Sequence, residues 1–283
     1  MSNIVKSIND DIVNLSNIGI FYNKDNNKAA EMAVTVTDIL KNKNIHSEIH
    51  TTDDFKENIT FALVLGGDGT ILKTARYYAK YDVPILGINL GRLGFLSQAK
   101  PTQVKEAIDL ILQGNFKIED RMMLSALDDK MNALNDIVIK GNGFSRTSRL
   151  YVHINENIVC DYLADGIIIS TPTGSTAYTL SAGGPILFPT LNAIVIVPIC
   201  PHTMNARPIV IPSCEVINVT SSQNKPLLKI SADGQNTLNL EPNQAIEVKK
   251  SEYNAKLLLL NMQKNSFYSV LKEKLHWGLS WQE

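Results

Sequence analysis

Two sequence textures meet near Gly114, and this change constrains the fold more than any other feature of the chain. Before it, short apolar runs that suit buried strands alternate with stretches whose apolar residues recur at helical spacing. This alternation predicts a mostly parallel sheet covered by helices, with ligands bound at the carboxyl ends of its strands. The strand-like runs are Ile18–Tyr22, Ile45–Thr51, Phe61–Leu65 and Val83–Ile88, and the helical stretches are 29–40, Thr70–Lys80 and Thr102–Gln113.

After Gly114 the chain is rich in short β-type runs, separated by turn residues such as Asp233-Gly234. This texture predicts an all-β domain of sandwich type. We therefore expect an α/β domain over residues 1–116, a β-rich domain over 117–254, and a C-terminal segment, 255–283, whose Phe267–Trp277 helix returns to the first domain. The β-type runs are Asp136–Lys140, Leu150–Ile154, Asp165–Ser170, Ala193–Val197, Val216–Thr220, Leu227–Ser231 and Ala245–Lys249.

Composition is that of an ordinary folded protein, with 44% hydrophobic and 19% charged residues in a chain of 283. A net charge of −1 gives no overall attraction to nucleic acid or anionic membranes. No apolar stretch reaches the roughly 18 residues that a membrane-spanning helix needs. Three scattered cysteines and unpaired histidines argue against a disulfide framework and a zinc site. We expect a cytoplasmic protein with no membrane or nucleic-acid partner and no metal held by protein groups alone.

One predicted strand ends in a glycine turn that presents a carboxylate. Phe61–Leu65 runs directly into Gly-Gly-Asp-Gly-Thr, and a helix is predicted to begin at Thr70. Glycine lets the backbone come close to a ligand, and the unpaired N–H groups of a helix N-terminus favour phosphate. An isolated Asp-Gly pair is usually only a turn. In this context we expect a phosphate loop with an acid, Asp68, beside it; the loop residues are Gly66, Gly67, Gly69 and Thr70.

A second glycine-rich stretch, Ser170–Pro185, follows another predicted strand. Five hydroxyl side chains lie between Ser170 and Thr176, at a predicted helix start. They suit a hydroxyl-rich, phosphate-bearing ligand, but hydroxyls that cap the following helix would give the same pattern.

Three other segments carry residues that fit either a ligand contact or an ordinary structural role. Asn135-Asp136 offers an amide and a carboxylate that suit a ribose and its base, or forms a plain strand-entry turn. Arg146 suits a bidentate phosphate contact, or is solvated surface. The Gly91–Leu96 loop follows a strand on the same side as Asp68, and it either faces a ligand or is a packed turn. We assign no catalytic role to His202, because a histidine in a proline-rich turn is more often structural.

Together these motifs resemble those of the NAD kinase family across most of the chain. Lipid kinases of the diacylglycerol and sphingosine type share the first motif, so the combination carries the resemblance. The matching residues are Gly66 to Thr70, Asn135-Asp136, Asp165-Gly166, Thr171 to Tyr178 with the tail Ser181 to Pro185, and Asp233-Gly234-Gln235.

The resemblance implies ATP-dependent phosphorylation of the 2′-hydroxyl of the adenosine ribose of NAD, which gives NADP. It also implies a Rossmann-like N-terminal domain and a homodimer or homotetramer with the NAD site near a subunit interface. By position, Asp68 matches the proton acceptor, Gly69 and Lys73 line the same site, and Asn135 with Asp136 matches the pair that holds the adenosine. Further implied NAD contacts are Arg146, Asp165, Thr176, Ala177, Tyr178, Thr179, Leu180, Ser181 and Gln235.

The chemistry agrees with this resemblance, because phosphoryl transfer depends mainly on positioning and charge neutralisation. A glycine loop and a divalent metal, Mg²⁺ or Mn²⁺, on the triphosphate of ATP supply both. Asp68 would then accept the hydroxyl proton, or would hold the metal. A lipid kinase with the same loop is one competing function, for which we find no basic amphipathic helix. A catalytically silent sensor of NAD or NADP is another, and inorganic polyphosphate is an alternative phosphoryl donor.

Overall fold

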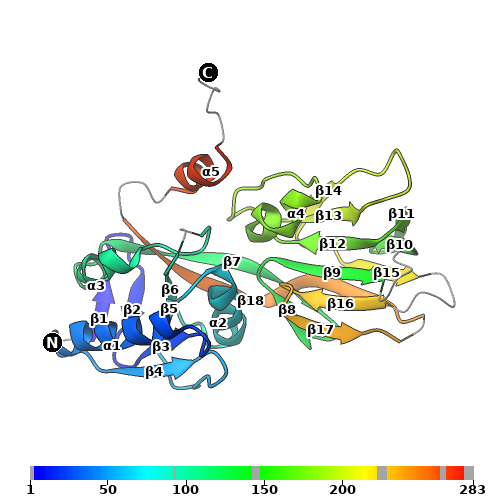
Figure 1. The fold of residues 1–283 in the computed structure, drawn as a ribbon. Helices are drawn as coiled ribbons and strands as arrows, with labels where there is room; N and C mark the ends of the chain where they lie inside the picture. The colour runs from blue at the N-terminus through cyan, green and yellow to red at the C-terminus, as the bar shows by residue number, and fades with distance from the viewer. Residues whose placement is uncertain are drawn as a thin grey trace. The chain divides into compact units, whose positions relative to one another are not determined.

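The structure, a computed structural model, describes residues 3–91, 94–141, 147–221, 228–241, 243–261 and 266–276. The chain forms two compact units, one of Met1–Asp120 with Ala255–Glu283 and one of Arg121–Asn254. Two long strands cross the boundary between them, β7 (Phe116–Ala126) and β18 (Ile246–Leu260) (Figure 1).

The first unit is built on a parallel sheet with the strand order β6-β5-β3-β4. The end of β18 joins β6 in parallel, with Leu257 opposite Ile85. All five residues of β5 are buried, as a strand covered on both faces requires. The strands are β3 (Ile18–Tyr22), β4 (Ser47–Thr51), β5 (Phe61–Leu65) and β6 (Ile85–Ile88).

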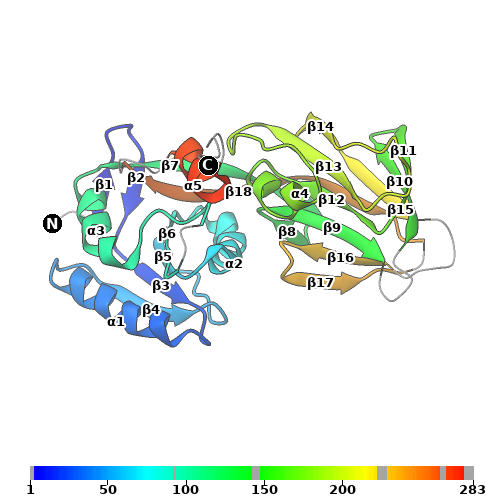
Figure 2. The same ribbon diagram turned by 45° about the horizontal axis from the view of Figure 1, so that its top comes forward.

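Helices cover both faces of this sheet (Figures 1 and 2). Helices α1 (Asn27–Lys41) and α3 (Val104–Leu112) share a core with Ile18 and Ile20 of β3. Phe21 points to the opposite face, where its ring lies 5.3 Å from that of Tyr78 in α2 (Asp68–Tyr78). Two short 3₁₀ helices, η1 (Ala79–Tyr81) and η2 (Pro101–Gln103), complete the connections. The predicted α/β architecture is confirmed.

The start of α2, an N-terminal hairpin and the C-terminal helix compare differently with the sequence prediction. Helix α2 begins at Asp68, not at Thr70, because Gly67 is the extended N-cap residue with φ −83° and ψ 179°. Asp68 therefore lies in the first helical turn, where a negative charge stabilises the helix. A hairpin of β1 (Ile4–Lys6) and β2 (Ile12–Asn14) was not predicted. The C-terminal helix is confirmed as α5 (Phe267–Leu275).

The second unit is almost entirely β-structure. Its larger sheet is antiparallel, in the order β14-β13-β12-β9-β16-β17, and the other sheet places β11, β10, β15 and the first part of β18 side by side. The strands not yet given are β8 (Met131–Ala133), β9 (Asp136–Gly141), β10 (Ser148–Ile154), β11 (Asn157–Ala164), β12 (Gly166–Ser170), β13 (Ala193–Ile199), β14 (Ile209–Pro212), β15 (Ile217–Ser221), β16 (Leu228–Ala232) and β17 (Asn236–Asn239).

Alternate residues of both sheets meet in one core, as in a sandwich. Ile137 and Ile167 of the larger sheet share this core with Leu150 and Val219 of the other. The predicted fold class, an α/β domain followed by a β-sandwich-type domain, is confirmed. After β12 the chain forms η3 (Thr173–Thr176) and the short helix α4 (Tyr178–Ser181), which lies beside β12 (Figure 2). In the described ranges, no helix has the length and apolar character that crossing a membrane requires.

Candidate functional site

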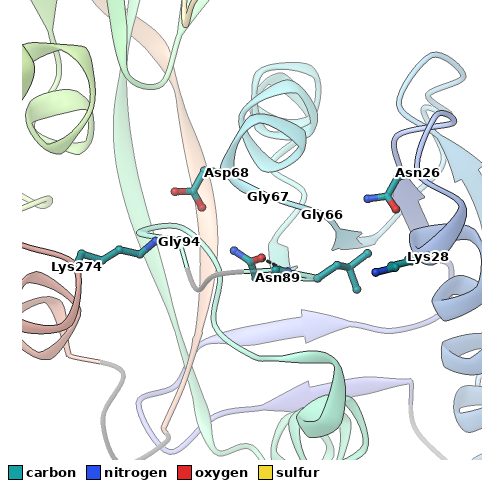
Figure 3. Close-up of a pocket in the computed structure, with 10 residues that line it drawn as sticks. Asn26, Lys28, Gly66, Gly67, Asp68, Asn89, Gly94 and Lys274 are labelled. Carbon is teal, nitrogen blue, oxygen red and sulfur yellow. Dashed lines mark hydrogen bonds between the residues drawn. The ribbon is translucent and has the colours of Figure 1, made fainter.

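A pocket of about 420 Å³ opens in the first unit, where β5 and β6 end. The glycine turn after β5 forms part of its wall, and the carboxylate of Asp68 stands at its edge (Figure 3). Gly67 is the N-cap of α2 and makes no side-chain capping bond, so its turn exposes the helix N-terminus. The described lining residues are Asn26, Lys28, Gly66, Gly67, Asp68, Asn89, Leu90, Gly91, Gly94 and Lys274.

The loop after β6 holds the carboxylate of Asp68. The N–H of Phe95 donates to Asp68 Oδ2 at 2.9 Å, and the N–H of Leu96 lies 3.4 Å from Oδ1. Gly94 packs against the carboxylate so closely that a Cβ at that position would overlap it. Gly94, Phe95 and Leu96 therefore orient the carboxylate beside the glycine turn, a role beyond that of a packed turn.

Two polar side chains shape this loop. Asn89, which is 4% exposed, accepts a bond from the N–H of Gly91 at 2.7 Å. Ser97 Oγ accepts from the N–H of Gly94 at 2.9 Å and lies 3.4 Å from Asn89 Nδ2. The position of Asp68 thus depends on a hydrogen-bonded loop and not on its own rotamer alone.

Lys73 points to a carboxylate outside the pocket. Its Nζ lies 2.7 Å from Asp53 Oδ1, and Lys24 binds the other oxygen of Asp53 at 2.8 Å. These two hydrogen bonds lower the pKa of Asp53 to about 2. Lys73 is not among the residues that line the pocket.

The second unit holds the other group of predicted residues, around the turn before β9. The carboxylate of Asp233 accepts bonds from three successive N–H groups: Leu134 at 3.1 Å, Asn135 at 2.7 Å and Asp136 at 3.2 Å. Asp233 donates its own N–H to Asp136 O at 2.9 Å. The predicted Asp233-Gly234 turn is confirmed, and both of these residues have positive φ, 51° and 67°. Gln235 belongs to this turn between β16 and β17, and its N–H donates to Ala232 O at 3.0 Å.

Asp136 is a buried acid, only 4% exposed. Burial, and then the charge of Asp233, raise its pKa from 3.8 to about 7. Near neutral pH this carboxyl therefore changes readily between a proton donor and an acceptor. When it is ionised, such a group can accept hydrogen bonds from a ligand that carries hydroxyl donors.

The hydroxyl-rich stretch divides into structural and outward-facing residues. Ser170 and Thr171 are fully buried and bond the carbonyls of Asn135 and Leu134, at 3.2 and 2.6 Å. Ser175 Oγ donates to Pro172 O at 2.7 Å and accepts from Leu187 N at 3.0 Å. These three hydroxyls hold the loop itself, but the N-cap residues of η3 and α4 make no side-chain capping bond. Thr176 and Ala177 are half-buried, and Tyr178 is 43% exposed.

Close backbone packing joins this stretch to the Asn135 turn. A Cβ on Gly174 would overlap the carbonyl of Asn135. The pKa of Tyr178 is raised by burial and then by the charges of Cys200, Asp136 and Asp165. Asp165 also lies 3.5 Å from Thr147 Oγ1. Asp136 pairs with Ser170 at one end of the β9–β12 ladder, and Asp165 precedes Gly166, which pairs with Lys140 at the other end, so the two carboxylates lie at opposite ends of these strands.

The remaining predicted residues have these places. Thr179 is fully buried, and its hydroxyl has no hydrogen-bond partner among the described residues. Leu180 is half-buried and Ser181 exposed on α4. Gly69 and Thr70 lie in the first turn of α2. Arg146 lies outside the described residues.

Several residues of the pocket were missed from the sequence. Asn26, Lys28, Asn89 and Lys274 line it, although they come from three separate segments of the chain. Asn26 had a readable signal, because asparagine before a helical stretch is a common N-cap, and its side chain accepts from Ala29 N. Lys274 had none, since only folding brings α5 to this pocket.

Carboxylates and other ligands for a metal are sparse at both places. Within the described parts of the chain, no group of three or more histidine, cysteine, aspartate or glutamate side chains could hold a metal ion. The pocket offers one carboxylate, that of Asp68.

Comparison with known families gives two matches that together cover most of the chain. The ATP-NAD kinase N-terminal domain matches residues 22–116, and the ATP-NAD kinase C-terminal domain matches residues 134–260. The first match contains the glycine turn with Asp68. The second contains the Asn135 turn and the hydroxyl-rich stretch.

Individual relatives agree with these matches. The NAD kinase of Natranaerobius thermophilus is 43% identical, over 81% of this chain and 82% of the relative. The NAD kinase of Moorella thermoacetica is 39% identical, over 95% of this chain and 92% of the relative.

Solved structures share the architecture. The crystal structure of an NAD kinase from Archaeoglobus fulgidus in complex with ATP has a TM-score of 0.76 and 25% identity, and the match covers 91% of this chain and 98% of that one. Yeast NADH kinase complexed with NADH has a TM-score of 0.81 and 24% identity, and the match covers 95% of this chain and 89% of that one. At this identity the likeness supports the fold alone.

Proposed function

This chain belongs to the NAD kinase family, and on that premise we propose that it transfers the terminal phosphoryl group of ATP to the 2′-hydroxyl of the adenosine ribose of NAD. The product is NADP. The observation that carries the proposal is the carboxylate of Asp68 beside the glycine turn at the N-terminus of α2, at the edge of a pocket. It puts a proton acceptor next to a phosphate site.

The donor phosphates bind at Gly66, Gly67, Gly69 and Thr70. The turn and the first turn of α2 present N–H groups that no preceding helical residue can bond. The NAD kinase structure from Archaeoglobus fulgidus supports this assignment, because that protein is 25% identical to this chain and is in complex with ATP. Polyphosphate has the same repeating phosphate chemistry and is a second candidate donor at this site.

The acceptor, NAD, binds to the second unit. The ionised carboxylate of Asp136 accepts hydrogen bonds from ribose hydroxyls, and Asn135 contributes an amide that both donates and accepts. Asp165, Tyr178 and the outward residues of Thr176–Ser181 belong to the same unit and supply its further NAD contacts. Gln235, Lys73 and Arg146 remain predicted contacts of this substrate or of the site around Asp68.

Asp68 accepts the proton of the 2′-hydroxyl as the oxygen attacks the terminal phosphorus. The bond from that phosphorus to the leaving oxygen breaks, and ADP keeps the electron pair. Carboxylates are weak bases, but in a loose transition state the proton moves late and a positioned carboxylate suffices. The N–H groups of Phe95 and Leu96 fix where the acceptor oxygens point.

A divalent cation fits the chemistry of this site when it arrives with the triphosphate. Mg²⁺ prefers oxygen ligands and keeps several waters, so one or two carboxylates beside substrate phosphates are its usual protein contribution. Asp68 is the carboxylate that would share it. When bound, the cation neutralises charge on the phosphates.

The direct test is a metal-dependent assay that offers NAD or NADH with ATP or polyphosphate and measures NADP(H). Formation of NADP from NAD and ATP is expected. A sensor without activity would bind NAD and give no product. A lipid kinase would give no NADP(H) in this assay and would phosphorylate diacylglycerol or sphingosine in a parallel assay that offers these lipids with ATP.

Two further parts of the proposal concern the cell and the assembly. Cys160, Cys200 and Cys214 are free thiols, in keeping with a reducing compartment such as the cytoplasm. A homodimer or homotetramer is expected from the family. Sedimentation of the purified protein measures it.

A further inference from the structure

We infer that Lys28 and Lys274 bind the phosphates of the donor, an assignment that rests on the proposed function. Both lysines line the pocket at the glycine turn. Lys28 belongs to the first turn of α1, and Lys274 to the last turn of α5. Neither was singled out by any sequence motif.

The two ammonium groups are available for a ligand. Lys28 and Lys274 are both exposed, and neither forms an ion pair with any carboxylate of the described residues. By contrast, Lys24 and Lys73 are committed to Asp53. An unpaired lysine on a flexible stem can follow a phosphate over several ångströms.

The charge of the pocket requires such cations. Among its described lining residues, Asp68 is the one anion and the two lysines are the cations. Without them the carboxylate of Asp68 would repel a triphosphate that carries several negative charges. The two lysines make the net charge of the described lining residues positive. The N-termini of α1 and α2, capped by Asn26 and Gly67, add partial positive charge at the same wall.

The two lysines lie at opposite ends of the pocket, so they contact different phosphates. In Figure 3, Lys274 extends toward Gly94 at the end of the pocket where Asp68 lies, whereas Lys28 lies beside Asn26 at the other end. Gly66 and Gly67 lie between these ends (Figure 3). Lys274 therefore contacts the phosphoryl group that is transferred, and Lys28 contacts the phosphates that stay with the leaving group.

Steady-state kinetics of three variants test this division. Lys274→Gln is expected to lower kcat about 10- to 100-fold, because a charge-assisted bond to the transferring group is lost. Lys28→Gln is expected to raise KM for ATP about 5-fold and to leave kcat within twofold. KM for NAD stays unchanged in both. Lys274→Arg, which keeps the charge, restores most of the lost kcat.

Matched controls lie on the same helices. Lys272→Gln on α5 and Lys41→Gln on α1 remove the same charge from positions that do not line the pocket. Both are expected to stay within twofold of the unmodified enzyme. ATP kinetics of Lys274→Gln and Lys28→Gln that match these controls would overturn the inference.

A binding measurement separates this inference from the proposed function. Titration of the unmodified protein with inorganic tripolyphosphate, followed by calorimetry, needs no turnover and no NAD. At least a 5-fold loss of affinity in Lys28→Gln and Lys274→Gln supports the lysine site even if no NADP is formed. Equal affinity in all variants contradicts it, even if the enzyme is an active NAD kinase.

Discussion

Gly94 leaves no space for a side chain beside the carboxylate of Asp68, since a Cβ there would overlap the carboxylate oxygen Oδ1. The next residue, Phe95, donates its N–H to the other oxygen at 2.9 Å. A loop after β6 thus fixes the acid that stands at the start of α2. The glycine permits the approach and the backbone N–H directs it.

Gly94→Ala should therefore displace the carboxylate of Asp68 and lower kcat at least 10-fold, with little change in the affinity for NAD. A misplacement of about 1 Å at a reacting group can cost about 100-fold in rate. Single-turnover formation of NADP and equilibrium binding of NAD measure the two effects. Gly91→Ala is the comparison, because its Cβ would meet nothing closer than 3.7 Å and should cost far less activity. Equal losses in both variants would remove the role given to Gly94.

The buried carboxyl of Asp136 should make stability depend on pH. Its pKa is about 7 in the folded protein against an ordinary 3.8, so the folded state keeps a proton that the unfolded chain has released. The free energy of unfolding therefore falls as pH rises from about 4 to about 7, by roughly 1.4 kcal/mol per pH unit, and levels off above that window. Asp136→Asn should lack this component. Urea unfolding of both proteins at several pH values gives the difference, and parallel curves would contradict the assignment.

The charge of Asp233 contributes to that raised pKa, so Asp233→Asn should lower the pKa of Asp136. Asparagine tolerates the positive φ of 51°, and its carbonyl oxygen can still accept the two N–H bonds of Asn135 and Asp136, whereas the bond from Leu134 to the other oxygen is lost. Since the ionised carboxylate accepts the ribose hydroxyls, KM for NAD should fall as pH rises through about 7. In Asp233→Asn this fall should occur at lower pH. An unchanged midpoint would separate Asp233 from the NAD site.

Much of the fold was predictable because the chain signals it locally. The buried run Phe61–Leu65 and the short β-type run Asp136–Lys140 predicted β5 and β9, and Gly114 marked the end of a helical stretch. The start of α2 was placed two residues late, although an acidic residue in the first turn was itself a signal. The β1–β2 hairpin was missed because its strands have three residues each and expose Ile4 and Ile12.

The site was less predictable than the fold, for a physical reason. Asp68 and Asp136 stand in motifs whose residue types already suggest phosphate and ribose chemistry. The groups that position these two carboxylates do not stand in such motifs. Asp233 reaches the Leu134–Asp136 turn from a distant hairpin, and Phe95 contributes only its N–H, which every residue except proline has. Lys274 likewise meets the pocket only through tertiary packing.

The most direct test of the central claim is the rate of phosphoryl transfer in Asp68→Asn, measured in a single turnover with saturating ATP and NAD. Asparagine keeps the size of the side chain and removes its ability to take a proton. We expect a fall in rate of about 10²- to 10⁴-fold, with NAD affinity within about threefold and a melting temperature only slightly lowered by the loss of the charge at the N-terminus of α2. A variant that transfers phosphate at the normal rate once saturated, and is defective only in binding NAD, would contradict Asp68 as the proton acceptor.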